Sequence, residues 1–316
     1  MTSILTPDLA DAMVRVTEKA AVAASTLVGR GDEKAADQAA VDAMRTAFND
    51  IDFKGRIVIG EGERDEAPML YIGEEVGTRT GPEIDIALDP LEGTTLTAKA
   101  MANALAVLAI APRGGLLHAP DTYMEKIAVG PGYPDDIVSL DTTPAEVIGE
   151  LAKAKGVDVG SMTACVLDRP RHADTIESLR SAGARIRLIT DGDVAGIIYT
   201  TDPATGIDLY VGSGGAPEGV LAAAALKCVG GQMKGRLVFR NDDERARASR
   251  VGITDFDRTY DLSELASDET VFCATGVTNG DLLEGVRTDA KGVQTHTLVM
   301  SSADGAVRMI RSKRPA

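Results

Sequence analysis

Hydrophobic positions along the first half of the chain change between helical spacing and strand spacing. Apolar residues recur every three to four positions over residues 9–27, and again from Asp32, a favoured helix N-cap, to about Phe48. Another helix is expected from about Thr94. Alternating or continuous apolar runs predict strands over residues 56–59, 84–88, 104–111 and 123–129. Helices interleaved with short strands indicate an α/β protein.

The second half of the chain repeats this pattern after a polar segment. Residues 135–160 are polar and enclose a short predicted helix. Helices are then predicted at residues 174–182 and 217–229. Strands are predicted at residues 162–167, 185–190, 208–211, 271–274, 295–300 and 306–310. Residues 241–247 are expected to form a charged, solvated segment without chemistry.

The length of 316 residues exceeds the usual size of a single hydrophobic core, so we predict two α/β lobes. The polar segment places the boundary near residue 155, which gives an N-terminal lobe of residues 1–155 and a C-terminal lobe of residues 156–316. Hydrophobic residues make up 44% of the chain but aromatic residues only 3%. Aliphatic side chains must therefore fill both cores.

The net charge and the cysteine content limit the binding partners and the cellular compartment that we expect. The net charge of −15 argues against nucleic acid and against an anionic membrane surface, because both repel an acidic protein. A small anionic substrate remains possible where cations reverse the field locally. Cys165, Cys228 and Cys273 lie far apart and are expected to be buried thiols in a reducing compartment. With neither a secretory signal nor a run of 18 apolar residues, we expect a cytoplasmic protein.

Two carboxylates directly follow the strand predicted at residues 84–88. Asp89 and Glu92 flank a sharp turn that includes Gly93, and Thr94 adds a hydroxyl group. Buried charge needs a counter-charge, and an oxygen-only ligand set suits a hard cation such as Mg²⁺ or Mn²⁺. The alternative is an ordinary acidic turn in which Glu92 complements the dipole of the next helix.

Asp37 and Glu61 are two further candidates. Asp37 shares a helix face with Val41 and Met44, so its carboxylate needs a partner unless it lies at a partly exposed edge. Glu61 begins an acidic run that ends at Glu66. Such clustering is self-repulsive unless it is solvated, as in an exposed loop, or bound to a cation.

Loops after three later strands carry charged or small residues. Gly212–Gly215 leads into a predicted helix whose first turn contains Glu218, which could bind a metal or simply complement the helix dipole. Arg169 and Arg171 suit bidentate phosphate contacts. The Asp191–Asp193 turn could accept hydrogen bonds from sugar hydroxyls or bind a cation. Ligands gather beyond strand ends in open α/β sheets, so these loops favour a shared binding region.

These residues together resemble the class II fructose-1,6-bisphosphatases of the bacterial type, from about Val16 to Ile310. The segment at Asp89 also looks like the signature of the metal-dependent, lithium-sensitive sugar and inositol phosphatases. The motifs that carry the resemblance are Gly29–Asp32, Ile59–Glu63, Asp65–Pro68, Asp89–Thr94, Tyr123–Lys126, Arg169–His172, Asp191–Ala195, Gly214–Gly219, Ala274–Thr278 and Gly280–Gly285.

The resemblance implies a sugar-phosphatase-like fold, a layered αβαβα sandwich of two lobes with the metals in the N-terminal lobe and the sugar phosphate on the C-terminal side. It also implies Mg²⁺ or Mn²⁺ as cofactor and a homodimer or homotetramer. The implied metal ligands are Asp37, Glu61, Asp89, Glu92 and Glu218. The implied substrate residues are Glu92, Gly93, Thr94, Tyr123, Arg169, Pro170, Arg171, Asp191, Gly192, Asp193 and Gly215.

The implied reaction is hydrolysis of the 1-phosphate of fructose 1,6-bisphosphate, a step of gluconeogenesis, with a metal-activated water as nucleophile. We expect Thr94 to orient this water, with Asp32 or Asp65 as the alternative candidates for that catalytic role. Other readings are a sedoheptulose 1,7-bisphosphatase or a dual-specificity enzyme, an inositol phosphatase, and a non-catalytic sensor of sugar phosphates. The sensor is disfavoured because a binding protein has no need of a water-orienting hydroxyl.

Overall fold

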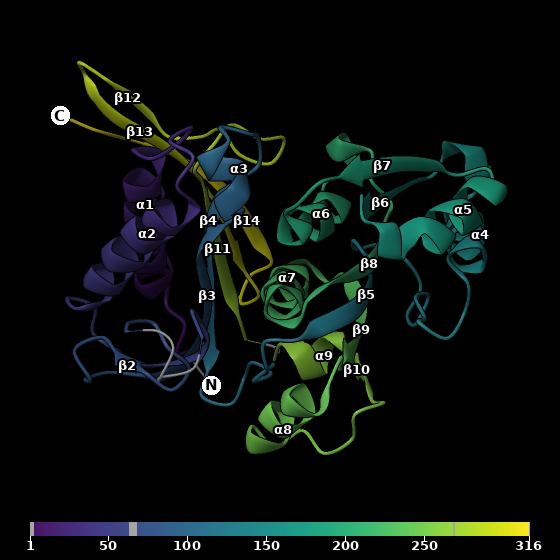
Figure 1. The fold of residues 1–316 in the computed structure, drawn as a ribbon, viewed down its shortest axis with the longest axis horizontal. Helices are drawn as coiled ribbons and strands as arrows, with labels where there is room; N and C mark the ends of the chain where they lie inside the picture. Colours follow the sequence, from purple (N-terminus) through teal and green to yellow (C-terminus); the bar gives the residue numbers. More distant parts are fainter. Residues whose placement is uncertain (1–2, 63–67, 268, 316) are drawn as a thin grey trace. The chain divides into compact units, whose positions relative to one another are not determined.

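The structure, a computed structural model, describes residues 3–62, 68–267 and 269–315. Its chain contacts divide it into two compact units (Figure 1). Unit 1 consists of Met1–Leu117 together with Ser267–Ala316, and unit 2 consists of His118–Ala266. Each unit contains a mixed sheet with helices packed on it, which confirms the predicted α/β class.

Unit 1 is built on a sheet that is largely antiparallel, with one parallel pair between β1 and β3. Its strands are β1 (Lys54–Ile59), β2 (Glu75–Val76), β3 (Glu83–Glu92), β4 (Leu105–Pro112), β11 (Val271–Gly276), β12 (Arg287–Asp289), β13 (Gly292–Ser301) and β14 (Ala306–Arg314). They follow the order β12-β13-β11-β4-β3-β1-β2, and β14 pairs with β13. Its helices are α1 (Pro7–Ser25), α2 (Glu33–Phe48) and α3 (Thr94–Ala98).

The long helices of unit 1 start and pack as their sequences predict. Thr6 caps α1 by accepting a hydrogen bond from the Leu9 N–H group at 3.3 Å, and Pro7 occupies the first turn. Asp32 caps α2 in the same way. The apolar faces of both helices share one hydrophobic core with β3, β4 and β11. The strand that carries Asp89 is therefore covered by packed helices.

A buried ion cluster fixes the start of β3. Asp85 is fully buried and accepts hydrogen bonds from the Arg56 Nε and Nη2 atoms at 3.1 and 3.0 Å. Arg113 Nη1 donates to the same carboxylate at 3.1 Å, and the Gly114 N–H group donates at 2.7 Å. A buried carboxylate with several charge-assisted donors is tightly held. This cluster ties β3 to both of its neighbours, β1 and β4.

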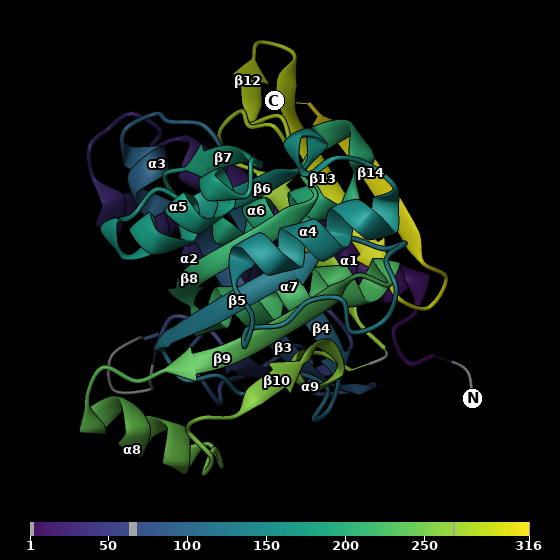
Figure 2. The ribbon, with the colours of Figure 1, turned by 90° about the vertical axis from the view of Figure 1, so that its right-hand side faces the viewer.

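Unit 2 is a second mixed sheet with helices on both faces (Figure 2). Its strands are β5 (Tyr123–Val129), β6 (Thr163–Leu167), β7 (Arg185–Ile189), β8 (Leu209–Gly215), β9 (Gln232–Val238) and β10 (Thr259–Asp261), in the order β10-β9-β5-β8-β6-β7. Its helices are α4 (Pro144–Lys155), α5 (Ala173–Ser181), α6 (Asp193–Ile198), α7 (Ala216–Val229), α8 (Asp242–Arg250) and α9 (Leu262–Leu265).

Alternation along β5 determines what each face of this sheet contacts. Ile127 and Val129 point into the core formed with α4 and α5. Met124 and Lys126 point to the opposite face, where they lie beside Gly219 of α7. Successive residues of one strand therefore serve two different layers, and the layer that contains α6 and α7 carries the candidate residues Asp193 and Glu218.

The predicted lobe boundary near residue 155 differs from the division in the structure. Residue 155 is the last residue of α4, which lies within the sequence range of unit 2. The chain returns to unit 1 after residue 266 because β11 and β13 complete the sheet that begins with β1, β3 and β4. Periodicity predicts where strands lie but not which strands pair, so it could not reveal this return.

The expectation of a solvated segment at residues 241–247 is wrong in part. These residues belong to α8 and its N-cap, and Glu244 is buried with 1% of its surface exposed. Its carboxylate accepts hydrogen bonds from Arg240 and from the Thr122 hydroxyl group. The prediction that Cys165, Cys228 and Cys273 are buried free thiols is confirmed. Within the described part of the chain, no helix is long and apolar enough to cross a membrane.

Candidate active site

A bulge at the end of β3 presents the acidic motif. Asp89 pairs with Val107 of β4 and Glu92 pairs with Leu105, so the register shifts between the two acidic residues. Bulges re-aim side chains, and here two carboxylates come close together. Asp89 and Glu92 each offer a carboxylate oxygen within 4.8 Å of the other. The Leu91 N–H group donates to Asp89 Oδ1 at 3.0 Å and orients that carboxylate.

Asp37 and Glu61 belong to the same group of charges in unit 1. Burial, followed by the charge of Asp89, raises the pKa of Asp37 to about 6. Burial, followed by the charges of Asp89 and Asp37, raises the pKa of Glu61 to about 8. Each carboxylate therefore makes it harder to ionise the others. A helix, the end of a strand and a bulge thus converge on one cluster of repelling acids.

These residues fit a divalent cation. Their donors are all carboxylate oxygens, which suit Mg²⁺ and Mn²⁺. The raised pKa values mean that the cluster cannot carry its full negative charge at neutral pH without compensation, and a cation supplies that compensation. Asp37 is only half-buried, and it extends the stripe of the buried residues Val41 and Met44 on α2, as its helical position predicts.

The three residues predicted for catalysis have different positions. Thr94 is the first residue of α3, directly after the bulge, and is half-buried. Asp32 is exposed, and its Oδ1 atom accepts a hydrogen bond from the Ala35 N–H group at 3.0 Å, which confirms the predicted N-cap. Asp65 and the acidic run around it, residues 63–67, lie outside the described residues. The catalytic roles themselves stay predictions.

In unit 2, Tyr123 is the centre of a cationic group. It is the first residue of β5 and pairs with Gly215 of β8. The guanidinium carbons of Arg171 and Arg240 lie 5.0 and 4.8 Å from the centre of its ring, a cation–π geometry. Arg240 also donates to Glu244 at 2.6 Å. Arg240 was not predicted as a site residue, because the charged segment that follows it contains no recognisable motif.

Arg171 and His172 both hold the end of β8, because Gly212–Gly215, predicted as a loop, are the last residues of that strand. The Arg171 Nε and Nη2 atoms donate to the Ser213 carbonyl group at 3.0 and 2.7 Å. The Ser213 N–H group donates to His172 Nε2 at 2.8 Å, and His172 Nδ1 lies 2.8 Å from the Leu167 carbonyl oxygen. This pattern requires a neutral imidazole that donates from Nδ1. Burial lowers the pKa of His172, which favours the same state.

The Asp191–Asp193 turn has one half-buried and one buried carboxylate. Asp191 Oδ1 accepts a hydrogen bond from the Gly192 N–H group at 3.1 Å. Asp193 is the first residue of α6, has 6% of its surface exposed, and forms an ion pair with Lys126. Lys126 belongs to the Tyr123–Lys126 motif but was given no role, although strand alternation could have suggested one, since it shares the inward face of β5 with Met124.

The remaining candidates lie at the starts of two helices in unit 2. Glu218 is the third residue of α7, and its half-buried carboxylate occupies the space where Gly215 would carry a side chain. The helix begins at Ala216, one residue before the start predicted at Pro217. Arg169 is half-buried and its Nη1 atom lies 3.4 Å from the Asp168 carbonyl oxygen, while Pro170 is exposed.

Comparison with known proteins decides the family. The model of a family described as "Bacterial fructose-1,6-bisphosphatase, glpX-encoded" matches residues 7–314. The chain belongs to this family. Class II membership, inferred above by resemblance, is thereby confirmed.

Relatives in this family have closely similar sequences over almost their whole length. The chain is 46% identical to each of two proteins from Synechococcus sp., strains JA-3-3Ab and JA-2-3B'a(2-13), and 43% identical to one from Trichodesmium erythraeum, strain IMS101. All three are named D-fructose 1,6-bisphosphatase class 2/sedoheptulose 1,7-bisphosphatase. Each alignment covers 94% of this chain and 93% of the relative.

The carboxylate cluster of this class II family member predicts an unusual pH dependence of stability. In metal-free protein, folded Glu61 keeps its proton up to about pH 8, whereas unfolded Glu61 loses it near pH 4.5. The folded state therefore binds more protons within this window, so the free energy of unfolding should fall as the pH rises through it. Urea unfolding in EDTA from pH 5 to pH 8 measures this fall. Excess Mg²⁺ should abolish it, and a metal-free stability that rises over the window would contradict the coupling.

Proposed function

We propose that this protein hydrolyses the 1-phosphate of fructose 1,6-bisphosphate and releases fructose 6-phosphate and inorganic phosphate. It would be a metal-dependent phosphoric monoester hydrolase of gluconeogenesis. The observation that carries the proposal is the coupled cluster of Asp37, Glu61 and Asp89, found in a chain that belongs to the class II family. The reaction breaks the bond between phosphorus and the ester oxygen, and the oxygen of a water molecule replaces the sugar.

We propose Mg²⁺ or Mn²⁺ as the cofactor, with Asp37, Glu61, Asp89, Glu92 and Glu218 as the ligands. Bound divalent ions supply water activation and neutralise charge on the transferring phosphoryl group. The bulge of β3 supports this assignment by fixing Asp89 and Glu92 at close range. Glu218 is included because its position in the first turn of α7 and the family motif around it match the sequence expectation.

Thr94 is proposed to orient the attacking water. Its place directly after the bulge keeps its hydroxyl group on the segment that carries Glu92 and Gly93, the proposed contacts to the scissile phosphate. Asp32 is the weaker candidate, because its carboxylate is exposed and already caps α2. Asp65 remains the other alternative.

The residues of unit 2 are proposed to bind the sugar and its second phosphate. Arg169, Pro170 and Arg171 would contact the phosphate that is not cleaved, and Tyr123, Asp191, Gly192, Asp193 and Gly215 would orient the sugar. The two guanidinium groups near Tyr123 support an anion at this position. We further propose a cytoplasmic homodimer or homotetramer that acts on a small sugar bisphosphate and binds neither nucleic acid nor membrane.

The first test is phosphate release from fructose 1,6-bisphosphate by the purified protein. We expect activity with Mg²⁺ or Mn²⁺, none in excess EDTA, and full recovery when the metal is restored, because few ligands hold each ion. Zn²⁺ should be a poorer activator of an all-carboxylate site. Full activity in excess EDTA would refute the metal assignment, and no phosphate release under any metal would refute the activity.

Substitutions at and directly after the bulge distinguish loss of cation binding from loss of the orientation of the attacking water. Asp89→Asn should lower kcat by about 10³-fold or more while the fold survives, since it removes both a ligand and a source of repulsion. Thr94→Ala should lower kcat by about 10²-fold and leave KM nearly unchanged, because its role is limited to the geometry of attack. Steady-state kinetics and thermal unfolding measure both effects.

Asp158→Asn is the matched control for these two variants. Asp158 is exposed and its side chain makes no capping hydrogen bond, so this variant should retain normal kinetics. A Thr94→Ala enzyme with normal kcat would transfer the orienting role to another residue.

Neutralising Arg169 should affect binding more than turnover. A contact to the uncleaved phosphate exists in both the ground state and the transition state, so Arg169→Ala should raise KM about tenfold with little change in kcat. Arg180→Ala, at an exposed position on α5, is the control and should change neither value. A lower kcat at constant KM would instead place Arg169 at the scissile phosphate.

Sedoheptulose 1,7-bisphosphate is the second candidate substrate. The names of the three relatives combine both activities, so a dual-specificity enzyme is consistent with them as well. The two substrates share the phosphates and differ in one carbon of the sugar. A direct comparison of kcat/KM for the two sugars distinguishes these possibilities.

A further inference from the structure

Lys126 is a fully buried cation within unit 2. It lies in the middle of β5 with none of its surface exposed. Its Nζ atom forms an ion pair with Asp193 Oδ2 and donates a hydrogen bond to the Gly215 carbonyl oxygen at 2.8 Å. A buried ammonium group is costly unless it is paired in this way. The contacts of this one side chain thus join the start of α6 and the end of β8.

Two glycines, Gly214 at the end of β8 and Gly219 in α7, make room for this ion pair. A side chain at Gly214 would overlap the Asp193 carboxylate and would lie 3.1 Å from Lys126 Nζ. A side chain at Gly219 would lie 2.6 Å from Met124 Sδ and 3.2 Å from Lys126 Cδ. Both positions would be closer than normal packing permits. The packing around Lys126 and Asp193 therefore requires glycine at both positions.

The two partners of Lys126 begin the two helices that carry proposed site residues. Asp193 is the first residue of α6, directly after Asp191 and Gly192. Gly215 directly precedes α7, whose third residue is Glu218. Arg171 and His172 form hydrogen bonds with Ser213, in the same end of β8. Lys126 adds the link between this strand end and the start of α6.

A purely stabilising role does not explain why the pair is ionic. Well-packed apolar side chains of similar volume commonly stabilise a core as well as a buried ion pair does. Hydrogen bonds are directional, so an ion pair fixes the orientation of its partners more strictly than apolar packing does. The hydrogen bond to Gly215 fixes the orientation of one peptide group, and the ion pair fixes one carboxylate.

We propose that Lys126 is a positioning residue, which sets the relative placement of Asp193 and Gly215 and, through the start of α7, of Glu218. This inference rests on the proposed function, because those three residues are proposed to contact the sugar or the metal. Lys126 itself would contact neither. Without it, the end of β8 would keep its backbone pairing with β5, but the Gly215 peptide group and the start of α6 would no longer be held in one arrangement.

The test compares Lys126→Met and Lys126→Arg with the wild-type protein. Lys126→Met keeps the length of the side chain and removes the donors, whereas Lys126→Arg keeps the charge but shifts them. We expect Lys126→Met to raise KM for fructose 1,6-bisphosphate at least about tenfold, a larger change than in kcat. Hydrogen exchange at residues 212–219 should become at least about tenfold faster, while the other strands of unit 2 keep their protection.

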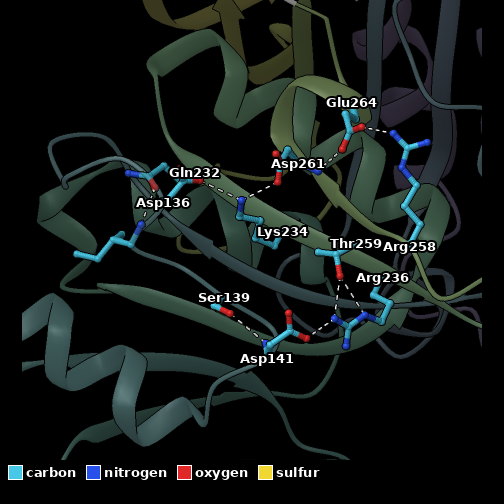
Figure 3. A network of polar contacts seen from close by, with 11 residues as sticks. Asp136, Ser139, Asp141, Gln232, Lys234, Arg236, Arg258, Thr259, Asp261 and Glu264 are labelled. Carbon is cyan, nitrogen blue, oxygen red and sulfur yellow. Dashed lines mark hydrogen bonds and ion pairs between the residues drawn. The ribbon is translucent and has the colours of Figure 1, made fainter.

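Lys234→Met is the matched control on the neighbouring strand β9. Lys234 Nζ bonds to Asp136 and Asp261 at 3.1 and 2.6 Å, in a network whose labelled members include none of the proposed site residues (Figure 3). Removing this surface pair should change KM and the exchange of residues 212–219 by less than about twofold. Gly214→Ala places a methyl group against the Asp193 carboxylate and Lys126 Nζ, and it should reproduce the effects of Lys126→Met.

The outcomes separate positioning from general stabilisation. Exchange that accelerates evenly over unit 2, or Lys126→Met kinetics within about twofold of wild type, overturns the proposal. If Lys126→Met does not fold, Lys126→Arg and Gly214→Ala decide by the same criteria. A wild-type protein that releases no phosphate refutes the proposed function alone, because the exchange measurement needs no substrate and still tests the positioning.

Discussion

The mutual repulsion of partly buried carboxylates is the constraint on which the candidate site in unit 1 depends. Asp37, Glu61 and Asp89 reach one cluster from a helix, a strand end and a bulge, and burial raises the pKa of the first two. Such a cluster is stable when it is protonated or when it binds a cation. Cation binding and deprotonation are therefore linked, and an acidic protein gains a local positive field that can accept an anionic phosphate.

Unit 2 places its positive charges in two different environments. Arg171 and Arg240 keep their guanidinium groups beside Tyr123, where they retain contact with solvent and can meet an anion. Lys126 is instead fully buried and is neutralised by Asp193. Two of these cations thus suit ligand binding, and the third suits the ordering of nearby segments. His172 holds the end of β8 as a neutral hydrogen-bonding group, with both ring nitrogens in use.

Prediction of individual elements succeeded where the periodicity was strong. The strand over residues 123–129 and the long helices that became α1 and α2 follow their apolar patterns closely. The strand expected to end at residue 88 continues to Glu92, because β4 keeps pairing beyond the bulge. The strand β9 was missed because polar residues such as Lys234 and Arg236 alternate with its inward positions. Local polarity concealed a strand that is stabilised by its neighbours β5 and β10.

The sequence alone determined the α/β class, the family and the residues of the acidic and basic motifs, because these depend on local spacing and residue chemistry. It could not determine that Asp37, Glu61 and Asp89 share one electrostatic environment, since pKa shifts depend on burial and distance in space. Nor could it reveal that unit 1 takes its last strands from the end of the chain. Strand pairing and the partner of Lys126 join residues far apart in sequence, and only the tertiary structure decides which of them meet.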